Sequence, residues 1–232
     1  DAAYGRSWLA TANRLIPPNV FPFEHDGLAA KYAVLSEADF ARECSIEARS
    51  VSVWARFAQP SRLVWAADEA AREAAEEAVL EAAPTLFEAT RPLVPNDMRD
   101  APLALFKAGF ALTYGAELRA ERGQRADAVV EADAERYRRL GESVLRERPG
   151  IGGGDPAAAQ RAWRARRRKG KALTIVRLVK ASGTFANGID YLAWKINRHA
   201  GTKIEVKPWQ RRWPLLAGLI LLPRLLKRGA IR

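Results

Sequence analysis

The sequence is poor in the side chains that metal centres and redox sites use. Its 232 residues include one cysteine, Cys44, and two histidines, His25 and His199. A single cysteine excludes an internal disulfide and fits a reducing compartment. Neither histidine stands at a spacing from cysteine or carboxylate residues that suits a metal ion. We therefore predict no metal site within the chain, and we regard both histidines as structural or surface residues.

Familiar catalytic motifs are also missing. The sequence contains no Gly-x-Ser-x-Gly segment and no evident set of serine, histidine and aspartate. The triple glycine 152–154 is not followed by Gly-Lys-Ser or Gly-Lys-Thr, so it is not a phosphate-binding loop. We predict that it is a flexible linker. The residues alone indicate no self-contained active site.

Acidic residues are scarce in the last third of the chain. Residues 151–232 contain 19 Lys or Arg but only 3 Asp or Glu, a balance of +16. The first 150 residues hold the remaining 19 basic and 24 acidic residues, a balance of −5. This asymmetry is typical of a basic interaction region attached to an ordinary domain. Nucleic acid and the anionic face of a membrane are the candidate partners.

The apolar stretch near the C-terminus is too short to span a membrane. Leu215–Leu226 is apolar except for Arg224, and twelve helical residues rise about 18 Å against a hydrocarbon core of about 30 Å. We predict that residues 209–232 form an amphipathic tail in the membrane interface. The predicted membrane contacts are Trp209, Arg211, Arg212, Trp213, Leu219 and Leu222. The alternative is that Leu215–Leu226 packs as a core helix on its own domain.

The first third of the sequence predicts a mixture of helix and strand. We expect a helix over Tyr4–Leu15, strands over 19–24, 28–36 and Pro60–Trp65, and a turn at Asp26-Gly27 between the first two strands. Ser36 is expected to cap a helix that runs to about Cys44, with Asp39 three residues on. These elements are too few for a complete sheet domain.

From Asp68 onward the pattern is helical. We expect helices over Glu69–Ala83, from Asp100 to about Arg122, and over about Ala126–Arg146, 156–169, 173–180 and 189–199, with a short strand over Lys203–Lys207. Pro84 is expected to end the first helix. Asp100 is expected to cap the second, with Pro102 tolerated in its first turn. In the third, the apolar residues fall on one face: Val129, Val130, Tyr137, Leu140 and Val144.

These elements predict an α+β protein that is mostly helical. We expect four regions along the chain. Residues 1–66 would be the remainder of a sheet-containing domain, and residues 67–150 a helical domain. Residues 151–208 would be a basic region after the glycine linker, and residues 209–232 the amphipathic tail.

Six short motifs occur, each once, between residues 18 and 177. They are Pro18-Asn-Val20, Ala30-Lys-Tyr-Ala-Val-Leu-Ser36, Ala55-Arg-Phe-Ala-Gln-Pro60, Phe110-Ala-Leu-Thr-Tyr-Gly-Ala-Glu-Leu-Arg119, Tyr137-Arg-Arg-Leu140 and Thr174-Ile-Val-Arg177. In order and spacing they resemble the Tam41/Mmp37 family of mitochondrial-type phosphatidate cytidylyltransferases. Ala55 and Gln59 depart from the glycine and lysine of the family's pattern.

The resemblance implies a partial nucleotidyltransferase domain, a winged-helix-like helical domain and a membrane-engaging C-terminal region. It implies an enzyme that joins CTP to phosphatidic acid, with Mg²⁺, and releases CDP-diacylglycerol and pyrophosphate for phospholipid and cardiolipin synthesis. The family's Gly-Ser loop and metal-binding aspartates would lie upstream of Asp1. We therefore expect that Mg²⁺ is held mainly by residues outside this chain, and that the isolated chain is inactive.

Two basic residues are candidates for catalytic contacts with phosphate. Lys31 lies in the middle of an otherwise apolar predicted strand, where a lysine is costly to bury unless it faces an anion. Arg56 lies in the second half of a similar apolar segment. Cations around the transferred phosphate stabilise the charge that builds on its oxygens. The alternative for both is an ordinary surface position.

Two further groups of residues are candidates for substrate binding. Tyr114, Glu117 and Arg119 lie within two turns of one predicted helix and are the nucleotide-binding candidates. There, Tyr114 would stack on cytosine or Glu117 would orient Arg119; the alternative is a surface ion pair. Arg177 and Lys180 share a helical face and suit the phosphatidate headgroup, although they also suit a solvated face.

Two other functions remain open. One is a nucleic-acid-binding module in which helices and an Arg-rich arm clamp phosphates; the other is a purely structural helical protein. The acidic helices before residue 150 and the tryptophans beside the leucine-rich stretch make nucleic acid the less favoured partner. The Ala- and Arg-rich composition suggests a bacterium, and hence a peripheral protein on the cytoplasmic face of the inner membrane, or on the matrix side of the mitochondrial inner membrane in a eukaryote. No oligomeric state is predicted.

Overall fold

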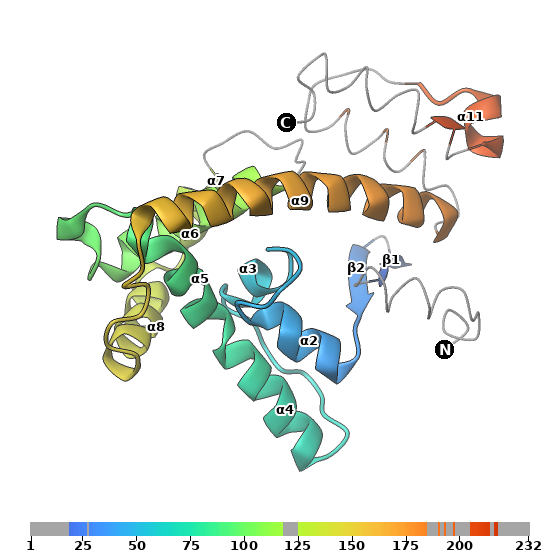
Figure 1. Ribbon diagram of the computed structural model, residues 1–232. Coiled ribbons are helices and arrows are strands. Elements are labelled where there is room, and N and C mark those ends of the chain that lie inside the picture. The colour runs from blue at the N-terminus through green and yellow to red at the C-terminus, as the bar shows by residue number, and fades with distance from the viewer. Residues whose placement is uncertain are drawn as a thin grey trace. The chain divides into compact units, whose positions relative to one another are not determined.

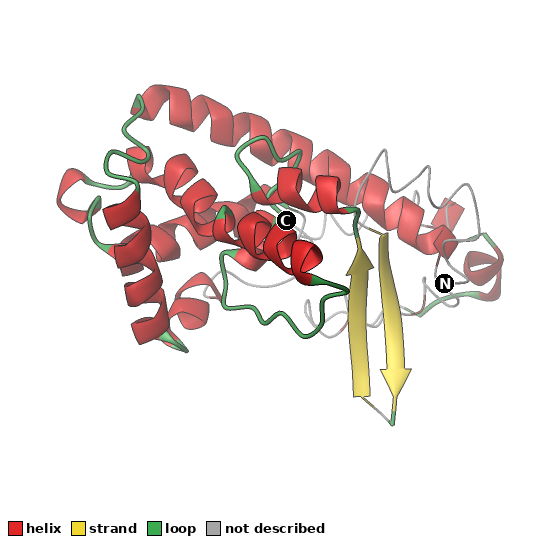
Figure 2. Ribbon diagram, turned by 90° about the horizontal axis from the view of Figure 1, so that it is seen from below, coloured by secondary structure: helices red, strands yellow, loops and turns green. Residues whose placement is uncertain are grey.

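The computed structural model describes residues 19–26, 28–117, 125–184 and 205–213, together with Asp190, Ala193, Asn197, Leu216 and Ala217. The chain forms two compact units. The hairpin unit comprises Asp1–Leu35, Leu118–Glu121 and Ala172–Arg232, and the helical unit comprises Ser36–Glu117 and Arg122–Lys171. Helices predominate and the strands form a hairpin (Figures 1 and 2), which confirms the mostly helical prediction.

The strands of the hairpin are β1 (Asn19–His25) and β2 (Leu28–Val34). They pair antiparallel, with Asn19 opposite Val34 at one end and His25 opposite Leu28 at the other. Asp26 has a positive φ of 49°, as a residue of a tight turn requires. The predicted strand pair and its turn are confirmed. Of the predicted strand near residue 205, the described residues 205–207 are not in a strand, and the predicted helix Tyr4–Leu15 lies outside the described residues.

The helical unit begins with α2 (Glu37–Cys44) and the short α3 (Trp54–Phe57). The Ser36 hydroxyl accepts a hydrogen bond from the amide of Asp39 at 3.2 Å, so the predicted N-cap is confirmed. Residues 60–66 then form neither helix nor strand. The strand predicted over Pro60–Trp65 is therefore wrong, because no strand pairs with this stretch in the described part of the chain.

Two helices follow, α4 (Glu69–Leu80) and α5 (Ala82–Thr90), and then two 3₁₀ turns, Arg91–Leu93 and Asn96–Met98. Asp68 caps α4 by accepting from the amide of Ala71 at 2.8 Å. Pro84 was predicted to end a helix, and this prediction is wrong, because Pro84 lies in the first turn of α5. A proline is tolerated there because the first amides of a helix have no intrahelical acceptor.

The next three helices are α6 (Pro102–Ala116), α7 (Arg125–Glu131) and α8 (Ala134–Glu147). Pro102 is the first residue of α6, but Asp100 is not its cap, because its carboxylate instead accepts from Arg91 at 2.6 Å. α6 ends six residues before the predicted Arg122. The single helix predicted over 126–146 is also wrong: the backbone of Asp133 leaves the helical conformation and separates α7 from α8.

An aromatic cluster holds these helices together. Phe106 on α6 contacts Phe87 on α5 and Tyr137 on α8 edge-on, both with ring centroids 4.9 Å apart. The predicted apolar face is confirmed for Val130, Tyr137 and Val144, which are buried. Edge-to-face aromatic pairs add about 0.5–1.5 kcal/mol each beyond their area burial.

The last long helix is α9 (Pro156–Thr184), a single helix where two were predicted. It follows a turn in which Gly152 is buried, has a φ of +64° and donates its amide to Glu88 at 2.7 Å. At Gly152 the linker prediction is wrong, because this glycine is packed and hydrogen-bonded, whereas Gly153 and Gly154 are exposed. Trp163 on α9 is also buried and donates its indole N–H to the carbonyl of Ala89 at 2.7 Å. The first half of α9 therefore belongs to the helical unit.

None of the described helices is both long enough and apolar enough to cross a membrane.

Candidate functional site

One hydrogen bond connects the regions of two motif segments in the helical unit. The Ser52 hydroxyl, just before α3, donates a hydrogen bond to the carboxylate of Glu117, just after α6. These residues are 65 apart in the sequence. The bond therefore joins the segments that contain residues 55–60 and 110–119.

Arg56 projects from this junction into solvent. The neighbouring residues of α3, Trp54 and Ala55, are buried, and Trp54 packs edge-on against Trp163 at 6.3 Å. Because these two side chains face the core, Arg56 on the same short helix is exposed. Its side chain has no hydrogen-bond or ion-pair partner among the described residues. An exposed cation without a counter-charge is available to an anionic ligand.

The structure describes two of the three nucleotide-binding candidates, Tyr114 and Glu117. Glu117 is engaged by Ser52, while Arg119 lies outside the described residues. Tyr114 is half-buried and packs against the core of the helical unit. Part of its ring is therefore used in packing, which the motif itself does not indicate.

Three of the predicted phosphate-contacting residues belong to the hairpin unit. Lys31 lies on β2 opposite Pro22 of β1, and its side chain is outside the described part. Arg177 is half-buried in the second half of α9, and the side chain of Lys180 is also outside the described part. These assignments remain predictions.

The predicted membrane-contacting tail is described only in part. Trp209 and Trp213, at the two ends of α11 (Pro208–Arg212), are 42% and 57% exposed. Arg211 forms a bidentate ion pair with Asp190 at 2.9–3.1 Å, which raises its pKa, whereas Arg212 is exposed. Leu219 and Leu222 lie outside the described residues.

The first half of α9 carries a basic stripe that the sequence analysis did not name residue by residue. Trp163 and Gly170 face the core, and four exposed basic residues follow one another at three- or four-residue spacing along the helix: Arg161, Arg164, Arg168 and Lys171. Arg164, Arg168 and Lys171 are exposed and have no partner among the described residues, and Arg161 is 3.7 Å from Asp155. We call Arg161, Arg164, Arg168 and Lys171 the α9 stripe. The three- and four-residue spacing from one basic residue to the next was its sequence signal.

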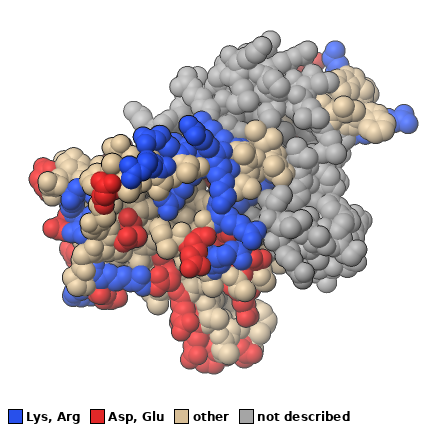
Figure 3. Space-filling view, in the orientation of Figure 1, with Lys and Arg blue, Asp and Glu red and all other residues tan. Residues whose placement is uncertain are grey.

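Figure 3 shows Lys and Arg side chains gathered over α9, and Asp and Glu gathered over α4. No Asp or Glu occurs within Pro156–Thr184. Arg166, beside the stripe, stacks on the Trp163 ring at 5.4 Å, and burial lowers its pKa. The positive charge of this helix is therefore not neutralised within the helix itself.

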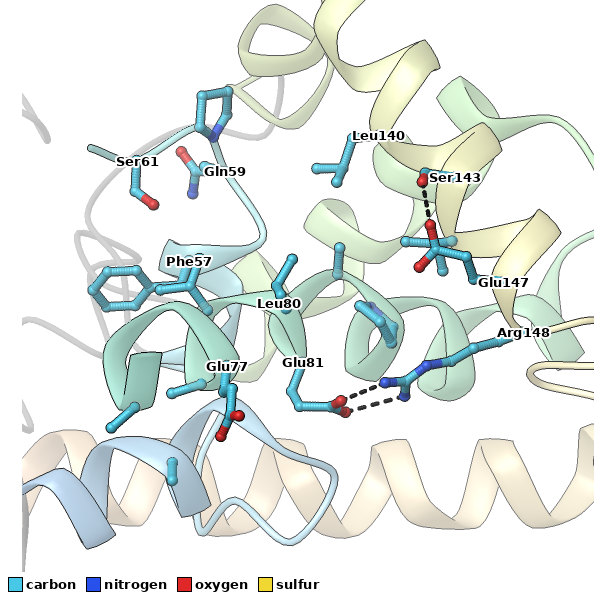
Figure 4. Close-up of a pocket in the computed structure, with 18 of the residues that line it drawn as sticks. Phe57, Gln59, Ser61, Glu77, Leu80, Glu81, Leu140, Ser143, Glu147 and Arg148 are labelled. Carbon is cyan, nitrogen blue, oxygen red and sulfur yellow. Dashed lines mark hydrogen bonds and ion pairs between the residues drawn. The ribbon is translucent and has the colours of Figure 1, made fainter. Parts of the chain in front are cut away.

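A cleft of about 940 Å³ opens on another part of the helical unit. It is lined by α2, α4, α8 and the residues that follow α3, and Leu80 and Leu140 face it (Figure 4). An ion pair between Glu81 and Arg148 borders it, with one contact of 3.0 Å. Two motif segments contribute to its lining, through Phe57, Gln59, Pro60 and Leu140, but none of the predicted site residues lines it.

Metal ligands do not gather anywhere in the described part of the chain. No group of three or more His, Cys, Asp or Glu side chains there could hold a metal ion. None of the described residues is therefore assigned to Mg²⁺.

No family model, curated protein or solved structure matches the chain.

Proposed function

We propose that this chain is part of a phosphatidate cytidylyltransferase that works at an anionic membrane surface. In this reaction a phosphate oxygen of phosphatidic acid attacks the α-phosphorus of CTP. The bond between the α- and β-phosphates breaks, and pyrophosphate leaves with the electron pair. The chain's own contribution would be to bind and orient the two phosphate-bearing substrates.

The observation that carries this proposal is the α3–α6 junction. The hydrogen bond runs from Ser52, three residues before one motif segment, to Glu117 within another, and the exposed Arg56 follows four residues after Ser52. A guanidinium fits phosphate oxygens as a two-pronged donor and stays charged at any physiological pH. We assign Arg56 to the CTP phosphates.

The α9 stripe supplies the second part of the proposal. Its cations are exposed, and three of them have no partner in the described structure. Each Lys or Arg near an anionic leaflet contributes about 1 kcal/mol to membrane binding. The stripe would therefore dock the protein on a membrane that contains phosphatidic acid. In the other unit, the exposed Trp209 and Trp213 of the tail suit the same kind of surface.

Nucleic acid is the second candidate, because the α9 stripe also suits a phosphodiester backbone. Binding of duplex DNA would weaken with salt with a slope of about 0.9 per phosphate neutralised. The acidic surface of α4 and the exposed tryptophans favour the membrane instead.

Binding of CTP tests the assignment of Arg56. Titration calorimetry of the chain with CTP is expected to show weak binding that Arg56→Ala reduces about tenfold, since a hydrogen bond to a charged group contributes about 1.5–3 kcal/mol. Arg62→Ala, which removes another exposed arginine of the same unit, is the matched control. If both variants bind CTP as the unaltered chain does, Arg56 does not contact the nucleotide.

A further inference from the structure

The stretch from Ser61 to Ala67, between α3 and α4, leaves its backbone unpaired. None of its residues takes part in a hydrogen bond within the described structure, by backbone or side chain. Its apolar side chains are also exposed: Leu63 by 43%, Val64 by 88% and Trp65 by 77%. This short segment therefore exposes both unpaired backbone groups and apolar side chains to solvent.

These residues are suited to a β-strand. Valine and tryptophan favour strands, and a strand that is covered on both faces has apolar residues at consecutive positions, as Leu63, Val64 and Trp65 are. Asp68, at the end of the stretch, already has an extended backbone, with φ −156° and ψ −178°. A long, apolar and unpaired segment of this kind is a template for pairing with another chain.

We propose that Ser61–Ala67 is a dimerisation strand that pairs antiparallel with the same stretch of a second copy of this chain. Strand addition would pair the amides and carbonyls along one edge of each strand and bring the exposed apolar side chains into cross-strand contact. A twofold axis at Val64 would place Val64 opposite its own copy, Leu63 opposite Trp65, and Arg62 opposite Ala66. This register leaves Pro60, which cannot donate a ladder hydrogen bond, outside the paired region.

Charge complementarity favours a second copy as the occupant. Arg62 is the only charged residue of the stretch, and in this register it does not face the Arg62 of the other copy. Its diagonal neighbour on the same face would be Asp68 of the second copy, which is exposed and whose carboxylate also caps α4. Twofold symmetry produces this opposite-charge pair twice.

Sedimentation equilibrium of the full chain tests the proposal. The unaltered chain is expected to form dimers, and Val64→Lys to be monomeric, because the twofold axis would place two lysines directly opposite each other. Leu80→Lys, at another exposed apolar residue of the same unit, is the matched control and is expected to remain dimeric. Circular dichroism checks that both variants keep their helices.

A charge swap makes the test specific for this register. Val64→Glu alone is also expected to be monomeric, but an equimolar mixture of Val64→Lys and Val64→Glu is expected to form a heterodimer, because opposite charges then meet at the axis. A chain that is monomeric at all concentrations, a dimer that Val64→Lys leaves intact, or a mixture that stays monomeric would each overturn the proposal. If the chain is monomeric, the partner of Ser61–Ala67 would have to be a different polypeptide.

Discussion

Cys44 is buried at the end of α2, beside the equally buried Glu43. Burial, and then the charge of Glu43, raise the pKa of its thiol to about 12. The thiolate is the reactive form of cysteine, so a thiol with this pKa is almost entirely unreactive at neutral pH. The sequence placed Cys44 at the end of a predicted helix but did not predict its burial. That burial depends on elements that are distant in the sequence.

We therefore expect Cys44 to resist alkylation in the folded chain. Labelling with iodoacetamide at pH 7.5 should be slower than labelling of the urea-unfolded chain by at least about 100-fold, since burial limits access and a raised pKa lowers the thiolate fraction. Mass spectrometry follows the reaction at this single thiol. Equal labelling rates in both states would show that Cys44 is accessible.

Tyr137 gives the fold a dependence on alkaline pH. Burial is the main cause that raises its pKa to about 12, from an ordinary value of 10.0. Folding thus favours the neutral phenol, and the stability that this contributes is complete below pH 10 and is lost as the pH rises from 10 towards 12. Denaturation by urea at pH 9, 10 and 11 should show a smaller decline in unfolding free energy for Tyr137→Phe than for the unaltered chain. Parallel declines would contradict this burial.

At the scale of elements, glycines permit the close approach of α6 and α9. A Cβ added at Gly170 on α9 would clash with the carbonyl oxygen of Ala116 at the end of α6, which is backbone and cannot rotate away. On α6, a Cβ at Gly115 would meet nothing within 4 Å. The two positions form a matched pair, because both lie within helices.

Gly170→Ala is expected to destabilise the chain by about 1–3 kcal/mol, the usual cost of overpacking. Gly115→Ala is expected to stabilise it by about 0.5–1 kcal/mol, since alanine loses less backbone freedom in a helix than glycine does. Urea denaturation followed by circular dichroism measures both changes. Stabilisation by Gly170→Ala would mean that α6 and α9 are further apart than described.

Local chemistry explains which elements the sequence could predict. Ser36 with Asp39, the β1–β2 alternation and the apolar face of α8 depend on residues a few positions apart, and these predictions are confirmed. The linker at Gly152 and the strand at Pro60–Trp65 failed for another reason. Gly152 is held by Glu88, which is 64 residues away in the sequence. Residues 60–65 do not form a strand, because no strand pairs with them in the described part of the chain.

The sequence predicted some residues of the candidate site but not the contact that links them. Arg56 and Glu117 followed from the resemblance, but the role of Ser52 in joining their segments did not, because it lies outside both motifs and 65 residues from its partner. The α9 stripe was visible as a run of basic residues. Which of them face solvent became clear only when Trp163 and Gly170 were found in the core.

For the molecule as a whole, we expect membrane docking to depend on the unbalanced charge of the chain, +11 in total with +16 in residues 151–232. Removal of three cations of the α9 stripe, by Arg164→Ala, Arg168→Ala and Lys171→Ala together, should cost about 3 kcal/mol of binding to an anionic membrane, a factor on the order of 100. The matched control removes three arginines of α8 that are paired with acidic neighbours: Arg136, Arg138 and Arg139.

Co-sedimentation with vesicles tests whether this chain docks on a lipid surface and presents phosphatidic acid to a nucleotide. The full chain should bind vesicles containing phosphatidic acid more tightly than phosphatidylglycerol vesicles of equal charge, the α9 triple variant should lose this binding, and duplex DNA should compete poorly. Equal binding to both lipids, unchanged binding by the α9 variant, or complete displacement by DNA would contradict the account.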